Sequence, residues 1–226
     1  MSYTFSDQQS LLSILLGDSL TGTTDAYPTA IRKKYINRGE LQYAKDTKML
    51  REKASGTISS SQISVPSDWL ETVTLIVNNF VITKEREISI RDWERWYNYN
   101  GNIPLYYMSE ESGTRYFKLL GGGINGLAYS LYYIKKPTTE LSADSDTSLF
   151  PEEFREASVY WSAFQLLTQL GKNSISDRNL QIYQKLVKDG QMYAEELYVK
   201  KDYAYPDNNI IDGFTNDIQG GGFDYA

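Results

Sequence analysis

The sequence contains no cysteine and no histidine among its 226 residues. The first absence excludes disulfides, thiolate zinc sites and cysteine nucleophiles, and the second excludes imidazole metal ligands and Ser-His-Asp triads. Only carboxylates, lysine, tyrosine and serine remain for catalysis. The sequence therefore points away from an enzyme and predicts no metal or other cofactor.

The sequence also lacks an uninterrupted apolar run of about 18 residues, and it has no charged start followed by an apolar segment. It predicts neither a transmembrane helix nor a signal peptide, and no membrane contact. At this length, folding buries roughly 70% of the surface of the unfolded chain, which permits a core without covalent cross-links. We expect a protein made and used in cytosol-like conditions, or in a particle assembled there.

Basic residues are in the minority, with 23 Lys and Arg against 29 Asp and Glu and a formal net charge of −6. Tight binding of a phosphate backbone requires clustered Lys and Arg. Two short basic groups, Arg32-Lys33-Lys34 and Lys135-Lys136, can contact a phosphate backbone or an acidic patch of a neighbour, but isolated groups of this kind are mostly solvated. The composition therefore argues against tight binding of nucleic acid.

Tyrosine is abundant, with 19 residues beside eight Phe and four Trp. Its rigid ring and polar hydroxyl suit surfaces that are wet before assembly and dry after it. Trp93, Trp96, Tyr106 and Tyr107 belong to an aromatic run that can form a sheet core, a subunit contact, or a platform that stacks on carbohydrate or bases. Sheet core and subunit contact are the commoner uses, and we include these four residues in a predicted partner interface.

Helical periodicity occurs at both ends of the chain. Ser6 and Gln9 have the spacing of a capping box and predict a helix over 7–16, and a second helix is predicted over 28–52. Near the other end, helices are predicted over 151–170 and 177–200, and they form an antiparallel hairpin because their connection after Gly171 is short. The apolar stripes expected to face the core are Ile31, Tyr35, Leu41 and Ala44; Phe154, Ala157, Trp161, Phe164 and Leu167; and Leu180, Tyr183, Val187, Ala194 and Leu197.

The middle of the chain alternates between apolar and polar residues. Asn78-Asn79 is expected to form a tight turn, because asparagine tolerates positive φ. Residues 88–96 read as a strand or as a single helical turn. The predicted strands lie at 63–65, 69–77, 80–83, 105–108, 115–119 and 127–135. No helix separates them, so we expect one small antiparallel sheet of four to six strands.

Residues 202–226 show neither the helical periodicity nor the strand alternation, and they are rich in Asp, Asn, Gly and Tyr. They nevertheless hold more apolar side chains than a plain disordered tail needs. We interpret this segment as an arm that docks on a partner or on a neighbouring copy. Its predicted interface residues are Tyr203, Tyr205, Ile210, Ile211, Phe214, Phe223 and Tyr225.

These patterns predict an α+β fold. An antiparallel bundle of about four helices comprises residues 1–53 and 148–201, a small antiparallel β insertion comprises residues 54–147, and an extended C-terminal arm comprises residues 202–226. Three motif-like groups carry little weight beside this architecture. Gly121, Gly123 and Gly126 precede a strand and not the helix that a dinucleotide site needs, and the calcium-like run that starts at Asp144 lacks the required glycine and the final glutamate. The carboxylate pairs Glu110-Glu111 and Glu152-Glu153 are candidates for a glycosidase only if they meet across a cleft.

The order of elements, together with scattered short motifs, resembles the head-to-tail adaptor, or connector ring, proteins of tailed bacteriophages, in particular the larger adaptors of short-tailed phages. The resemblance covers roughly residues 5–200. The motifs that carry it are Ile36-Asn37-Arg38-Gly39, Val65-Pro66-Ser67-Asp68-Trp69, Ile103-Pro104-Leu105-Tyr106-Tyr107, Tyr132-Tyr133-Ile134-Lys135-Lys136-Pro137, and Phe150-Pro151-Glu152-Glu153-Phe154.

The resemblance implies a structural virion protein at the head-tail junction, made in the cytoplasm of the bacterial host. Family members commonly form a ring of twelve copies under the portal, contact tail or nozzle proteins, and line part of the DNA conduit. It implies no catalytic residues, since the function lies in surfaces. The alternatives are an aromatic-rich module of a phage tail that binds carbohydrate or a receptor, and a carboxylate-based hydrolase.

Overall fold

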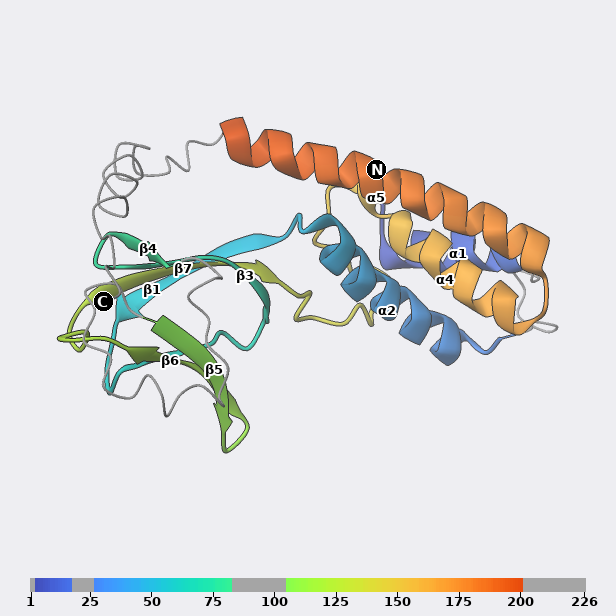
Figure 1. The fold of residues 1–226 in the computed structure, drawn as a ribbon. Helices are drawn as coiled ribbons and strands as arrows, with labels where there is room; N and C mark the ends of the chain where they lie inside the picture. Colours follow the sequence, from blue (N-terminus) through green and yellow to red (C-terminus); the bar gives the residue numbers. More distant parts are fainter. Residues whose placement is uncertain (1–2, 18–26, 83–104, 201–226) are drawn as a thin grey trace, which may run out of the picture.

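The computed structural model describes residues 3–17, 27–82 and 105–200, and in this part of the chain helices and strands form two separate groups (Figure 1). The helices are α1 (Phe5–Leu16), α2 (Thr29–Thr47), α4 (Ala157–Gln169) and α5 (Asn173–Lys200), with a short 3-10 helix at Glu152–Phe154. The strands are β1 (Arg51–Thr57), β2 (Gln62–Ser64), β3 (Trp69–Val77), β4 (Phe80–Ile82), β5 (Leu105–Glu111), β6 (Thr114–Leu120) and β7 (Ala128–Lys135). The predicted α+β class, with four helices and antiparallel strands, is confirmed.

The helical hairpin near the end of the described chain is confirmed, and its turn is tighter than expected. Gly171 has a φ of 71°, in the left-handed region. Its N–H donates to the carbonyl of Thr168, and the N–H of Lys172 donates to the carbonyl of Leu167.

 Gly17, the residue that ends α1, is also left-handed, with a φ of 76°. Both helices therefore stop at a residue whose left-handed backbone favours glycine.

The first two helices differ from their predictions at their ends. Thr4 and not Ser6 caps α1, because its hydroxyl accepts from the N–H of Asp7 while the Asp7 carboxylate accepts from the N–H of Thr4. Helix α2 was predicted to reach Glu52, but it ends at Thr47, since Lys48 adopts a φ of 52° and turns the chain into β1.

The buried faces of α2 and α4 match the predicted stripes only in part, since Ala44, Ala157 and Leu167 are buried as predicted and other positions differ. On α2 the side chain of Ile31 is exposed while those of Ile36 and Tyr43 are buried. On α4 the buried positions are Ala157, Ser158, Val159, Ser162, Ala163, Leu166 and Leu167, and Trp161 is only half-buried. Small residues allow close helix approach on this face, whereas the prediction weighted the largest side chains.

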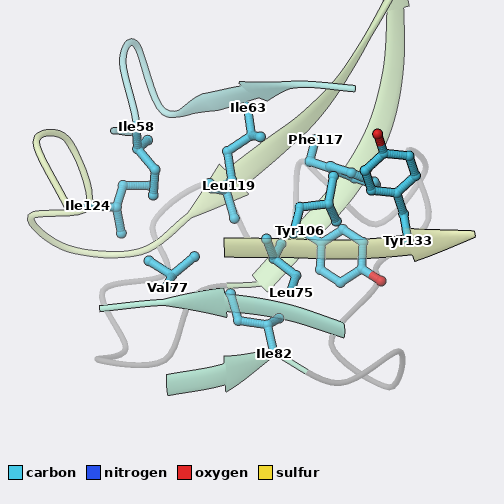
Figure 2. Packing of buried hydrophobic residues seen from close by; sticks show 11 residues of the cluster. Ile58, Ile63, Leu75, Val77, Ile82, Tyr106, Phe117, Leu119, Ile124 and Tyr133 are labelled. Carbon is cyan, nitrogen blue, oxygen red and sulfur yellow. The ribbon is translucent and has the colours of Figure 1, made fainter. Parts of the chain in front are cut away.

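The strands form two antiparallel sheets and not the single sheet that was predicted. One sheet has the strand order β1-β7-β3-β4, and the other has the order β2-β6-β5. Side chains from both sheets meet in one hydrophobic cluster, so the sheets pack face to face (Figure 2). The labelled members of this cluster are Ile58, Ile63, Leu75, Val77, Ile82, Tyr106, Phe117, Leu119, Ile124 and Tyr133.

Strand β1 was not predicted, although it pairs along its whole length with β7, from Arg51 opposite Ile134 to Thr57 opposite Ala128. Its sequence, REKASGT, holds residue types that are depleted in strands. It lies at the edge of its sheet, where charged side chains are favoured because they discourage pairing with other chains. The pairing with β7 imposes this strand against its local sequence preference.

The remaining β predictions hold in outline. Asn78 and Asn79 form the predicted turn with φ of 48° and 68°. Strand β3 has the predicted bounds, but the register shifts between Thr72 and Thr74, so Val73 is exposed despite its place in the alternation. The hairpin of β5 and β6 turns at Ser112-Gly113, which makes both strands longer than predicted.

The predicted element at 88–96 and the arm at 202–226 lie outside the described residues. The division into helical body, β insertion and arm therefore stays a prediction.

A candidate docking pocket beside helix α2

The chain that returns from the strands to the helices, residues 136–149, is held beside α2 by an asparagine. The Asn37 amide nitrogen donates to the carbonyl of Leu141 at 3.0 Å, and the Asn37 amide oxygen accepts from the N–H of Leu141 at 2.8 Å. This paired bond fixes the position of the returning chain along α2. Leu141 itself is buried with the residues of α1 and α4.

The calcium-like part of this segment serves as a turn that covers the start of α1. The Asp146 carboxylate accepts from the N–H groups of Ser142 and Ala143, both at 2.8 Å, and these bonds lower the pKa of the Asp146 carboxyl. The carbonyl of Asp146 accepts from the N–H of Phe5 at 2.7 Å. Among the described residues, no group of three or more acidic side chains is placed to hold a metal ion.

A pocket of about 460 Å³ opens between α2 and this returning chain. Three cationic residues line it: Lys34 and Arg38, one turn apart on α2, and Lys136 from the returning chain. Leu149 lines it as well, and 54% of this leucine is exposed. Glu40, Glu140 and Asp146 line it too, so the pocket combines charges of both signs with apolar surface.

The cations of this pocket differ from their sequence neighbours in their pairing. Lys33 lies 3.5 Å from the Asp144 carboxylate, and Lys135 lies 2.8 Å from that of Glu52. Within the described part of the chain, Lys34, Arg38 and Lys136 make no ion pair with a carboxylate. Arg38 instead lies over the ring of Tyr35, 5.5 Å from the ring centre.

A buried carboxyl group, that of Glu40, lies at the inner wall of the pocket. It accepts from the amide of Gln8 at 3.0 Å and from the hydroxyl of Ser148, and only 3% of the residue is exposed. Burial raises the pKa of the Glu40 carboxyl, although bonds from Ser148, Ser158 and Gln8 and the charge of Arg155 oppose that rise. The network joins α1, α2 and the segment before α4.

The structure brings together one residue from each basic group of the sequence, Lys34 and Lys136. Arg32, from the same group as Lys34, was expected to be solvated, but it is buried and donates to the hydroxyls of Ser13 and Thr29. Sequence reasoning missed Glu40, because a glutamate in a helix ordinarily faces solvent. The nearby Gly39, which allows close approach of another helix, is the one local signal that this side of α2 is covered.

The predicted interface residues are not gathered at this pocket. Tyr106 is buried in the β core with its ring centre 5.6 Å from that of Phe117, and Tyr107 is half-buried. Trp93, Trp96 and the seven arm residues lie outside the described part of the chain. The use of these residues in a partner interface stays a prediction.

The carboxylates considered for a hydrolase have structural contacts. Glu110 pairs with Arg115 at 3.3 Å, and Glu111 pairs with Lys118 at 2.8 Å. Glu152 accepts from the N–H of Tyr3 at 3.2 Å. No helix in the described part of the chain has the length and apolar character needed to cross a membrane.

Comparison with known protein families identifies the fold as that of a described family. A family model described as SU10 adaptor protein matches residues 3–204, which include all the helices and strands described above. No curated protein matches the chain.

Proposed function

This chain belongs to the SU10 adaptor protein family, and from that premise we propose that it forms a ring that connects the head of a bacteriophage to its tail. Membership of this family makes it a structural phage protein, an adaptor that contacts other components of the virion. The ring, its site under the portal and its part in the DNA conduit are the proposal. The family match over residues 3–204 carries this proposal.

The proposed partners are a portal protein on one side, a tail or nozzle protein on the other, and copies of the chain itself, in a ring of twelve. A ring requires a heterologous interface, in which two different surfaces of the subunit meet. The pocket beside α2 provides a surface with charged side chains of both signs and exposed apolar area, which suits one half of such an interface. Double-stranded DNA passes through the ring without specific binding.

Electron microscopy of the protein mixed with its portal tests this function. We expect ring-shaped density added to the narrow end of the portal, with the portal alone and the protein alone as controls. A ring that forms only in the presence of the portal also supports the proposal, because a portal can template assembly. A chain that leaves the portal density unchanged at saturating concentration would contradict it.

A further inference from the structure

We infer that Asn125 is a modification site, where deamidation is suppressed by the fold and proceeds only when two loops between the strands separate. The loops are residues 58–61, between β1 and β2, and residues 124–127, between β6 and β7. The modification concerns the chain itself and does not depend on whether a ring forms.

The residue after Asn125 determines the chemistry. Asn125 is exposed and is followed by Gly126, which has no side chain to shield its main-chain nitrogen from the asparagine amide. In deamidation, this nitrogen attacks the Cγ atom of the asparagine, ammonia leaves, and a five-membered succinimide forms. Water then opens either carbonyl of the ring, which gives aspartate or isoaspartate. The net reaction consumes water and releases ammonia, and it needs no other reactant.

The geometry of the turn explains why this reactive pair occurs here. Gly126 has a φ of 84°, which disfavours any residue with a side chain, and the N–H of Leu127 donates to the carbonyl of Ile124 at 3.3 Å to close the turn. The Asn125 amide oxygen accepts from the N–H of Ser61 at 2.6 Å. The turn therefore favours glycine at 126, while the contact with the facing loop uses the amide at 125.

The main restraint acts on the attacking atom. The N–H of Gly126 donates to the carbonyl of Ile58 at 3.0 Å. The nitrogen attacks only after it has lost its proton, and a hydrogen bond from that N–H opposes the loss, as it does in amide hydrogen exchange. The bond from Ser61 alone would not protect Asn125, because it polarises the amide. It contributes by tying the amide to the facing loop.

Buried side chains hold the two loops together. Ile58 and Ile124 are 2% and 4% exposed, and both belong to the β core (Figure 2). The N–H of Ile58 also donates to the carbonyl of Leu127 at 2.9 Å. Separation of the loops exposes apolar surface and breaks these hydrogen bonds, so the open state is a minor state of the folded chain.

Mass spectrometry of the full-length chain tests this inference. The folded protein and the same protein in guanidinium chloride are kept in mildly alkaline buffer, and conversion of amide to acid is followed in tryptic peptides. Asn100-Gly101 is the same residue pair and calibrates the reaction in the unfolded chain, and trypsin separates the two pairs because Arg115 and Lys118 lie between them. We expect the two pairs to react within about threefold of each other when unfolded, and Asn125 to react at least about tenfold more slowly when folded.

Hydrogen exchange identifies the restraint, because the same proton must leave in both reactions. We expect the Gly126 amide of the folded chain to be protected at least about tenfold. Ile58→Ala, which weakens the packing of the loops, should raise the deamidation rate of the folded chain at least about threefold. Ile36→Ala is the matched control and should leave that rate unchanged, since Ile36 is also buried but lies in α2. If Ile58→Ala does not fold, the two measurements on the original chain decide the question.

Three results would overturn the inference. Equal rates at Asn125 in the folded and unfolded protein would show that the loops do not restrain the reaction. Slow deamidation with an unprotected Gly126 amide would place the restraint elsewhere. An equal rise in Ile58→Ala and Ile36→Ala would show that the reaction requires unfolding of the whole chain and not separation of the loops. None of these results changes the proposed function, which the microscopy tests separately.

Discussion

At the scale of single residues, Gly39 shows how one missing side chain sets the distance between two helices. A Cβ atom at this position would overlap the carbonyl oxygen of Ser158 in α4. Glycine inside a helix costs up to about 1 kcal/mol relative to alanine, so propensity alone marks it as a weak point of α2. The close contact with α4, which a side chain at this position would prevent, explains why glycine occurs here despite that cost.

We predict that Gly39→Ala destabilises the protein by about 1 to 3 kcal/mol, because the added methyl group forces α2 and α4 apart. Urea unfolding followed by circular dichroism measures the change. Gln184→Ala, at an exposed position of α5, is the control and should change the free energy of unfolding by less than about 0.5 kcal/mol. A stabilising effect of Gly39→Ala would mean that α2 and α4 are not in close contact here.

Glu40 makes stability depend on pH in an unusual direction for a carboxyl group. Its pKa is raised in the folded protein by burial, so between its usual value and the raised value the folded state binds more protons than the unfolded state. The free energy of unfolding therefore falls as pH rises through this window. The stabilising contribution is complete only below the usual pKa.

We predict that Glu40→Gln removes this part of the pH dependence. The variant should gain stability relative to the original chain between about pH 4 and about pH 7.5, since its amide stays neutral throughout. Urea unfolding at the two pH values measures the effect.

Glu140→Gln is the control for that comparison, because Glu140 also lines the pocket but its side chain is exposed. Its stability should follow that of the original chain at both pH values. If Glu40→Gln instead lost stability as pH rose, the Glu40 carboxylate would be stabilised in its charged form, and the assigned direction of its pKa would be incorrect.

The pocket shows which site features the sequence reveals. Lys34 and Lys136 each belong to a basic group visible in the sequence, but their meeting depends on the return of the chain along α2, which no local pattern encodes. The burial of Arg32 and Glu40 was equally hidden, because each is covered by residues more than 100 positions away or by a different helix. Charged residues are predicted to face solvent by default, and tertiary contacts reverse that default here.

At the scale of elements, α4 shows that the size of a side chain does not identify the buried face of a helix. Val159, Ala163 and Leu166 are fully buried, whereas Trp161 is half-buried and packs against the cluster around Tyr43. The face with small residues is the one that other helices approach.

We predict that Leu166→Ala costs about 3 kcal/mol of unfolding free energy, within the range for fully buried leucines. Trp161→Ala should cost less than Leu166→Ala, because part of the indole is already in contact with water. Urea unfolding of the two variants in the same buffer measures the difference. The reverse order would place Trp161 in the core and contradict the assigned face of α4.

The strands and helices also differ in how well their sequences predict them. Strand β7 is rich in tyrosine and aliphatic residues, and β3 is bounded by Pro66 and the Asn78-Asn79 turn, so both were predicted closely. Strand β1 was missed because its partner β7 lies more than 70 residues further along the chain. Local propensity cannot report a strand that exists because of such distant pairing.

At the scale of the whole molecule, the negative charge is unevenly placed. Residues 1–201 are almost neutral, with 24 acidic and 23 basic residues, and the remaining five acidic residues follow them. The described part of the chain therefore has no charge excess to attract or repel DNA strongly. The ion pairs of this part of the chain join lysines and arginines to carboxylates of the same subunit.

We predict that the full chain does not retard duplex DNA in a gel-shift experiment at about 10 µM protein and about 0.15 M salt. The matched control replaces all five aspartates of 202–226 with asparagine, which removes the excess negative charge. This variant should also fail to retard DNA, since residues 1–201 remain close to neutral. Tight binding by the control would show that the acidic segment masks a DNA-binding surface.

The pairing of β1 with β7 has a consequence for how this architecture can diversify. The chain leaves the helices at Leu50 and comes back at Lys135, and the N–H of Lys135 donates to the carbonyl of Leu50 at 2.8 Å. The residue that leaves the helices and the residue that returns to them are therefore immediate neighbours in space. A β region of another sequence, joined at the same two residues, would leave the distance between the two helix ends unchanged.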